Sequence, residues 1–150
     1  MLRRLIILLL IVGCDKNSTE SSVHPLVGVW EFVQAVYTFT ALECSSEELN
    51  EDYTETAQEF QFTMVFNVDG LYVYSGGYVL DTNAELGGEF SGTGIWTTTN
   101  NNKLVITYTD EDYTDTETYD YSITGTTLTL NMPEVNDCST ELSVYTFTKQ

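Results

Sequence analysis

Basic side chains are scarce in this chain: five lysines and arginines stand against 23 aspartates and glutamates in 150 residues. Both arginines, Arg3 and Arg4, lie at the N-terminus, and His24 is the one histidine. So acidic a surface repels nucleic acid and anionic lipid headgroups. Zinc sites and phosphate clamps also lack the residues that they normally use. We therefore expect no nucleic-acid partner, no cofactor and no metal site.

The shortage of histidine also argues against an enzyme. Nucleophile–base pairs usually need histidine, and His24 stands beside Pro25 in a polar segment, where we interpret it as a bystander. No glycine-rich phosphate loop is present in the sequence. Carboxylates are numerous enough for a two-carboxylate glycosidase, but no pair of them stands out. We predict a protein without catalytic residues.

Long hydrophobic runs are absent apart from residues 5–12 (LIILLLIV), which follow the two arginines and end at Gly13 and Cys14. A helix that spans a bilayer needs roughly 20 apolar residues, so this run is too short to cross a membrane. A basic start, a short apolar stretch and small residues at its end are typical of a secretory signal peptide.

The end of this segment, Ile11-Val12-Gly13-Cys14, resembles the lipobox of bacterial lipoproteins. The resemblance implies that residues 1–13 are a cleaved lipoprotein signal peptide and that Cys14 carries a diacylglyceryl group. Several acyl chains on one residue hold a protein durably on a membrane. We expect a cell-envelope protein anchored to a bacterial membrane, the outer rather than the inner, with its domain in the periplasm or at the cell surface. An ordinary signal peptide or an uncleaved anchor is the alternative.

Processing at Cys14 would leave Cys44 and Cys138 as a pair in an oxidising compartment, where thiols tend to form disulfides. We predict a disulfide between them, which closes a loop of about 95 residues and stabilises the fold by about 4 to 5 kcal/mol. A metal site is the weaker interpretation, since the sequence has no CxxC motif. Processing would also remove both arginines, which argues against anionic ligands. The remaining bases would be Lys16, Lys103 and Lys149.

Beyond Cys14 the chain divides into a tether and one domain. Residues 14–24 are small and polar, as in a flexible linker, and residues 25–150 have the length of a single domain. This domain is rich in Thr, Tyr, Val and Phe, which favour β-strands. Apolar and polar residues alternate with period two in many places. We predict eight strands, at residues 27–40, 57–67, 70–80, 90–98, 103–109, 116–123, 126–132 and 141–149.

Short turns with Gly, Asn or Asp join most of these strands, for example the hairpin signal Asp69-Gly70. This pattern favours an all-β fold: an eight-stranded antiparallel up-and-down barrel, closed so that no edge stays open. The connection at residues 44–57 is longer and acidic. Ser45 and Glu48 there match a capping box, which allows a short helix across one end of the barrel.

The segment LVGVW at residues 26–30 resembles the first strand of bacterial lipocalin-like domains. Later pieces follow in a similar order: an Asp-Gly hairpin at residues 66–70, a Gly-x-Trp strand at residues 94–96 and a Tyr-x-Phe strand at residues 145–149. The resemblance covers residues 25–149 and implies a lipocalin-like barrel, often carried on a lipoprotein leader. In true lipocalins an arginine packs over the first-strand tryptophan, and the domain here has none.

An eight-stranded barrel can either fill its interior or hold one small ligand. We interpret Trp30 and Trp96 as core residues. We hypothesise a barrel that binds a small apolar ligand, neutral or cationic; a non-catalytic envelope interaction module with a packed interior is the alternative. An interior void above roughly 300 Å³ would favour the first. Six bulky residues are the candidate ligand contacts: Phe62, Tyr72, Tyr74, Tyr108, Tyr119 and Tyr121.

The acidic run at residues 110–117 raises the question of calcium, because hard cations favour clustered carboxylates. An EF-hand loop needs glycine at its sixth position, and this run has no glycine. A second acidic stretch, beginning at Asp81, has Leu86 at that position. We interpret residues 110–117 as a solvated hairpin tip, with calcium binding as the alternative.

Overall fold

The structure, a computed structural model, describes residues 23–41, 52–80, 86–109, 113–135 and 139–150. Within these residues the chain forms nine β-strands and no helix, which confirms the predicted all-β class. The strands are β1 (Gly28–Ala41), β2 (Tyr53–Thr56), β3 (Phe60–Phe66), β4 (Leu71–Val79), β5 (Leu86–Thr99), β6 (Lys103–Thr109), β7 (Thr114–Thr124), β8 (Thr127–Val135) and β9 (Ser139–Lys149).

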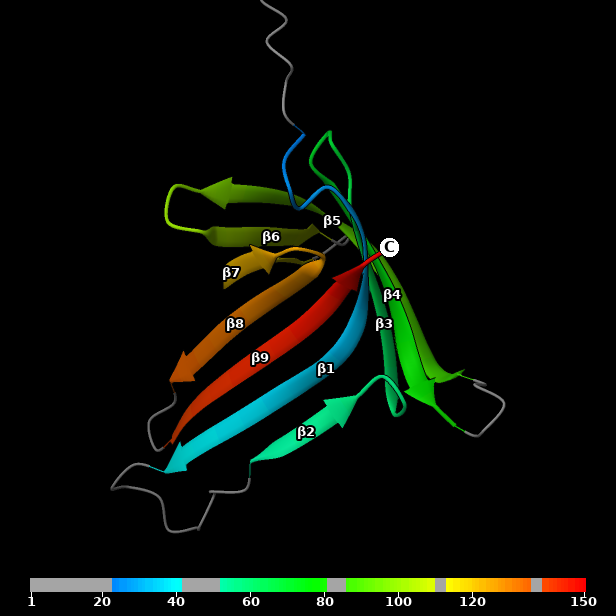
Figure 1. The fold of residues 1–150 in the computed structure, drawn as a ribbon, viewed down its shortest axis with the longest axis vertical. Helices are drawn as coiled ribbons and strands as arrows, with labels where there is room; N and C mark the ends of the chain where they lie inside the picture. The colour runs from blue at the N-terminus through cyan, green and yellow to red at the C-terminus, as the bar shows by residue number, and fades with distance from the viewer. Residues whose placement is uncertain (1–22, 42–51, 81–85, 110–112, 136–138) are drawn as a thin grey trace, which may run out of the picture.

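Eight of these strands form a closed antiparallel barrel (Figure 1). From β3 to β9 each strand pairs with the next one in sequence, and β1 pairs with β3 on one side and with β9 on the other. The β1–β9 ladder runs from Trp30–Lys149 to Ala41–Ser139 and closes the barrel. Closure satisfies backbone groups that an open sheet would leave at its edges. The predicted up-and-down eight-stranded barrel is therefore confirmed.

The ninth strand, β2, lies in the connection for which the sequence allowed a short helix. Residues 34–37 of β1 pair with residues 53–56 of β2, whereas residues 28–31 of β1 pair with β3. β2 and β3 are thus two parts of one interrupted strand along β1, and the backbone N–H of Ala57 donates to the Val33 carbonyl at 3.1 Å between them. The helix prediction is wrong for the segment that forms β2, whose threonines favour a strand. Ser45 and Glu48 lie outside the described residues.

One end of the barrel is closed by a hydrophobic cluster around Trp30. Trp30 and Leu26 are both fully buried, and the Trp30 indole N–H donates to the Leu26 carbonyl at 2.7 Å. His24, the last residue of the predicted tether, also packs here: its ring centroid lies 5.5 Å from that of Trp96 and 6.4 Å from that of Tyr121. The segment before β1 therefore folds across this end, which we call the closed end.

A lysine lies over Trp30, the tryptophan of the first strand. It occupies the place where lipocalins have an arginine, which this domain lacks. Lys149 Nζ is 5.2 Å from the centroid of the Trp30 ring and donates to the Pro25 carbonyl at 3.0 Å. Gly28 leaves the space for it, because a Cβ there would lie 2.7 Å from Lys149 Cε. The positive φ of 138° at Gly28 is also one that other residues rarely adopt. The C-terminal strand is thereby fastened to the segment that closes the barrel.

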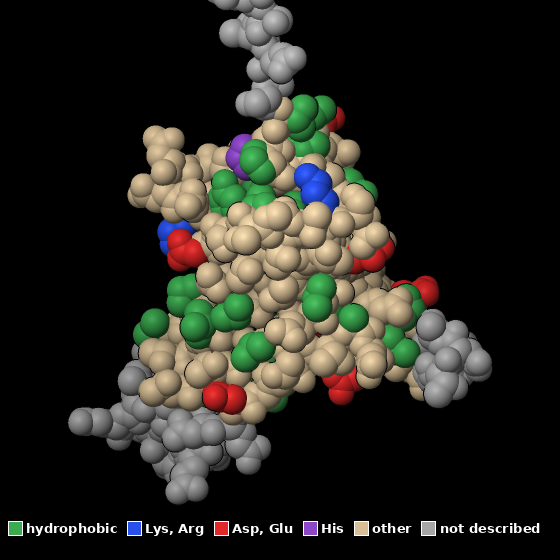
Figure 2. Space-filling view, in the orientation of Figure 1, with side chains coloured by type: hydrophobic (Ala, Val, Ile, Leu, Met, Phe, Trp, Pro, Cys, Tyr) green, Lys and Arg blue, Asp and Glu red, His purple; other side chains and the backbone are tan. Residues whose placement is uncertain are grey.

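Several predictions concern residues outside the described part of the chain. They are the signal peptide at residues 1–13, the lipidated Cys14, residues 14–22 of the tether, and the Cys44–Cys138 disulfide. All of these stay predictions. Among the residues that the structure describes, no helix is long and apolar enough to span a membrane. The face of the barrel in Figure 2 carries scattered acidic groups and few basic ones, in keeping with the composition.

Candidate functional site

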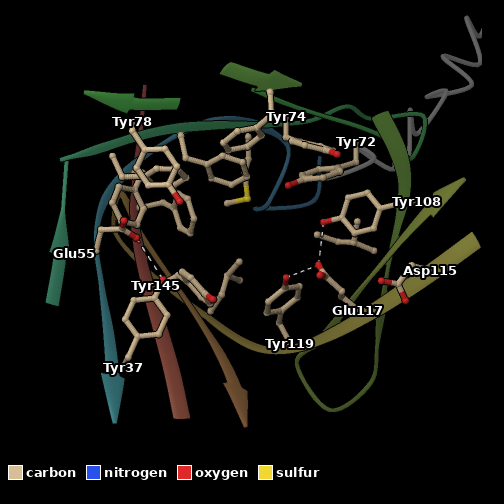
Figure 3. A pocket seen from close by; sticks show the side chains of 18 of the residues that line it. Tyr37, Glu55, Tyr72, Tyr74, Tyr78, Tyr108, Asp115, Glu117, Tyr119 and Tyr145 are labelled. Carbon is tan, nitrogen blue, oxygen red and sulfur yellow. Dashed lines mark hydrogen bonds between the residues drawn. The ribbon is translucent and has the colours of Figure 1, made fainter. Parts of the chain in front are cut away.

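A cavity of about 530 Å³ lies inside the barrel. Figure 3 shows its wall of inward-pointing side chains. Its floor consists of buried core residues: Phe32, Met64, Ile106, Leu130 and Phe147. Trp30 does not line it, so the floor separates the cavity from the closed end. Tyr78 and Tyr113 line the cavity while 56% and 66% exposed, which identifies its mouth.

Aromatic side chains make up most of the cavity wall. Five of the six predicted contact residues line it: Phe62, Tyr72, Tyr74, Tyr108 and Tyr119. Period-two alternation explains their common direction, because side chains two residues apart on a strand point to the same face. Tyr121, the sixth, is not among the lining residues and packs near His24 at the closed end. Five further aromatic residues, which were not among the predicted contacts, also line the cavity: Tyr37, Tyr78, Phe90, Tyr113 and Tyr145.

The tyrosine rings of β4 and β6 pack against each other at one side of the cavity. Tyr108 meets Tyr72 and Tyr74 edge to face, with ring centroids 5.9 and 5.6 Å apart and interplanar angles of 70° and 87°. Such pairs stabilise a packed arrangement by about 0.5 to 1.5 kcal/mol beyond area burial. Gly92 of β5 permits this arrangement, because a Cβ at that position would overlap the Tyr74 ring. The wall is therefore held in place by ring contacts within the cavity.

Three carboxylates line the cavity: Glu55 from β2 and Asp115 and Glu117 from β7 (Figure 3). Among the described residues, no lysine, arginine or histidine lines it. The one ion pair in the described part of the chain joins Lys103 to Asp120, at 2.7 Å. Asp120 neighbours Tyr119 in β7 and so points to the outer face. The cavity is consequently an aromatic space with negative charge only.

Glu117 accepts more hydrogen bonds from described residues than either of the other two carboxylates. Its Oε2 accepts a hydrogen bond from the Tyr108 hydroxyl at 3.0 Å and another from the Tyr119 hydroxyl at 2.5 Å. Burial raises the pKa of both tyrosines well above the usual value of about 10, and the nearby Glu117 charge raises it further. Both hydroxyls therefore stay protonated at neutral pH and donate to the carboxylate.

A second polar group lies on the β1–β2 side of the cavity. The Tyr37 hydroxyl donates to Glu55 Oε2 at 3.4 Å, and the Tyr37 ring stacks on Tyr53 with centroids 4.3 Å apart. Burial raises the pKa of Tyr37 above its ordinary value, and the charge of Glu55 contributes to the shift. This bond is longer than those to Glu117, so Glu55 is the more loosely held carboxylate.

The sequence contains a pattern that indicates the inward position of Glu117. Asp115, Glu117, Tyr119 and Tyr121 alternate along β7, so two residues of the acidic run share the inward face of the tyrosines. The run is thus not solely a solvated tip, although Asp115 is exposed at the mouth. Glu55 was missed because residues 44–57 were interpreted as a connection.

The described part of the chain contains no preformed metal site. No three His, Cys, Asp or Glu side chains in it come close enough together to hold a metal ion. Residues 110–112 of the acidic run lie outside the described residues, so calcium binding by the whole run stays untested.

Comparison with models of known protein families finds no match to this chain, and a search of curated protein sequences finds none either. What the cavity can bind therefore follows from its own residues.

Proposed function

We propose that this protein is a lipid-anchored, lipocalin-like protein of the bacterial cell envelope that binds a small apolar ligand without transforming it. The main observation that supports this proposal is the cavity inside the barrel. Ligand pockets are typically about 300 to 1,000 Å³, and this one has about 530 Å³. Its wall of phenylalanine and tyrosine rings suits the apolar body of such a ligand.

The charge of the cavity restricts the ligand to neutral or cationic molecules. An anion would enter a space with three carboxylates, and no base among the described lining residues could pair with it. Burying an unpaired charge beside like charges is strongly unfavourable. The alternative function, an interaction module with a packed interior, requires a filled barrel, and a cavity of this volume argues against that.

The orientation of the chain is compatible with a lipid anchor on Cys14. The described chain enters the barrel at the end where β1 begins, whereas β1 ends and β2 begins at the opposite end (Figure 1). Tyr37 and Glu55, near that opposite end, line the cavity. An anchored barrel would therefore hold its closed end toward the membrane and its cavity away from it.

Ligand binding is tested with the neutral fluorescent probe N-phenyl-1-naphthylamine. We expect saturable fluorescence enhancement with one site per chain. Leu130→Trp should fill the cavity and reduce binding by about tenfold or more, because Leu130 lines it and is 2% exposed. Leu142→Trp is the matched control, since Leu142 is 41% exposed and does not line the cavity. Circular dichroism confirms that both variants fold. Absence of saturable binding, or equal losses in the two variants, would overturn the proposal.

The anchor is tested separately by Cys14→Ser. We expect the wild-type protein in the membrane fraction at its processed size, and the variant unprocessed or released. A variant that stays in the membrane fraction at the processed size would contradict the lipobox interpretation.

A further inference from the structure

We propose that the ligand of the cavity is an organic cation with an apolar body, and that Glu117 pairs with its ammonium group. This inference rests on the proposed function and narrows it from apolar molecules in general to one chemical class. It follows from three features of the cavity: the position of Glu117, the rings around it, and the apolar surface opposite.

Glu117 is a half-buried carboxylate without a cationic partner in the described part of the chain. Both tyrosine hydroxyls donate to the same oxygen, Oε2, and no donor among the described residues bonds to Oε1. Two neutral donors only partly replace the water that a carboxylate loses on burial. An ammonium group in the cavity would supply the missing charge and form a charge-assisted hydrogen bond or a close ion pair with this carboxylate.

Tyrosine rings surround this carboxylate. Tyr108 and Tyr119 bond to it directly, and the Tyr72 ring packs against the Tyr108 ring with centroids 5.9 Å apart. Tyr72 and Tyr74 are roughly parallel, with an interplanar angle of 26°, and both stand nearly perpendicular to Tyr108. These rings form two walls of a box. Ammonium groups bind favourably to ring faces within about 6 Å, and aromatic boxes recognise methylated ammonium groups in particular.

Phenylalanines supply an apolar surface for the remainder of the ligand. Phe60, Phe62 and Phe90 form a cluster with ring centroids 5.8 to 6.1 Å apart, and all three line the cavity. Tyr74 joins this cluster to the tyrosine box, because its ring centroid is 6.1 Å from that of Phe62. A molecule with an ammonium group at one end and an aromatic or aliphatic group at the other would match both regions.

Glu117 fits this role better than the other two carboxylates of the cavity. Asp115 is exposed at the mouth, where water screens its charge. Glu55 lies on β2 and interacts with one tyrosine through a bond of 3.4 Å. Glu117 combines partial burial with two shorter hydrogen bonds that hold its orientation. Pairing strength depends on such fixed geometry and on exclusion of water.

The test uses two probes of the same shape, benzyltrimethylammonium and its neutral carbon isostere neopentylbenzene, each displacing N-phenyl-1-naphthylamine from the full domain. In Glu117→Gln we expect the affinity for the cation to fall about tenfold or more and the affinity for the isostere to stay within about twofold. Unchanged affinity for the isostere also shows that the variant is folded. Glu55→Gln should lower cation affinity less, and the exposed Glu134→Gln should leave both affinities unchanged.

The outcomes separate the inference from the proposed function. If neither probe displaces the dye from the wild-type protein and the dye itself does not bind, the proposed function fails. If the isostere binds but the cation does not, or if Glu117→Gln leaves cation affinity unchanged, the inference fails while ligand binding stands. An equal loss in Glu134→Gln would also overturn the assignment to Glu117.

Discussion

At the scale of single residues, the most distinctive feature of this protein is Glu117, a carboxylate that accepts hydrogen bonds from tyrosines in the cavity wall. Phenols are neutral at physiological pH, so they can be buried in a cavity wall without the cost of burying charge. Their hydroxyls still require partners, and here Tyr108 and Tyr119 find one carboxylate between them. The cavity is thereby polar at specific atoms and apolar elsewhere, which is the usual composition of a selective ligand site.

Alkaline pH should reveal these buried tyrosines. Burial raises the pKa of Tyr37, Tyr72, Tyr108 and Tyr119 above the value of about 10 expected in the unfolded chain. Above about pH 10 the folded state therefore holds more protons than the unfolded state, and stability falls as the pH rises. Below about pH 10 these groups contribute no pH dependence. We expect late phenolate absorbance that coincides with loss of the circular dichroism signal. Reversible ionisation of all tyrosines near pH 10 in a folded protein would contradict this.

Trp30 should be the residue on which the closed end depends most. Trp30→Phe removes the indole N–H that bonds to the Leu26 carbonyl and leaves a buried acceptor without its partner. Unpaired buried acceptors cost about 1 to 3 kcal/mol, and the smaller ring adds a packing defect. We expect urea denaturation to show a loss in this range or larger. Tyr113→Phe, at a residue 66% exposed, is the control and should change stability little. Similar effects in both variants would disprove the assigned role.

At the scale of single elements, β2 shows how a strand can be interrupted and still complete a sheet. β1 is 14 residues long, but β3 pairs with only its first part. β2 pairs with a later part of β1 and brings Glu55 to the cavity. Without this short strand, that part of β1 would present unpaired backbone groups along one edge. The interruption between β2 and β3 therefore shapes the wall of the site.

Glycines in β4 set how closely the strands of the cavity wall approach. A Cβ at Gly76 would lie 2.5 Å from the Gln61 carbonyl oxygen of β3 and 2.8 Å from the Phe90 ring. Gly76→Ala should therefore force the backbone apart and destabilise the fold by about 1 to 3 kcal/mol. Gly125→Asn is the matched control, because Gly125 has φ of 61°, which asparagine tolerates, and open space around it. Thermal unfolding compares the two, and a larger loss in the control would refute the argument.

At the scale of the whole molecule, the barrel has two unlike ends. The closed end holds Trp30, Leu26 and the segment that leads in from the N-terminus, and the other end contains the aromatic cavity. The β1–β9 ladder, which links the first and last strands, spans most of the length between them. With the proposed lipid anchor at the N-terminal side, the closed end would face the membrane and the cavity would face away from it.

The predicted disulfide would fasten this ladder at its far end. Ala41 pairs with Ser139 as the last rung of the β1–β9 ladder. Cys138 is adjacent to Ser139, and Cys44 follows Ala41 by three residues, a segment that spans at most about 11 Å. Cys44 and Cys138 themselves lie outside the described residues, so the disulfide stays a prediction from the sequence. We expect no free thiol from either residue in exported protein and a lower melting temperature in Cys44→Ser/Cys138→Ser. Two titratable thiols without reductant would rule the bond out.

Period-two alternation was enough to predict most strands and the inward direction of Phe62, Tyr72, Tyr74, Tyr108 and Tyr119. It failed where local signals were mixed. The short segment of β2 follows an acidic, polar stretch and was interpreted as part of a connection, because its pairing with β1 is a long-range contact that a four-residue pattern does not reveal. β5 begins at Leu86, before the predicted residue 90, because pairing with β4 extends it through two glycines that disfavour strands on their own.

The sequence by itself determined that the chain is all-β, that its strands follow one another as a meander, and which side chains share a face, since these depend on local alternation and turn chemistry. Only the tertiary structure decided that the interior is a cavity rather than a packed core. The volume left between opposite walls depends on how side chains from β1, β4, β6 and β7 meet across the barrel. Those strands are far apart in sequence, so no local pattern predicts the space between them. Nor does a local pattern predict that no basic side chain among the described residues pairs with the charge of Glu117.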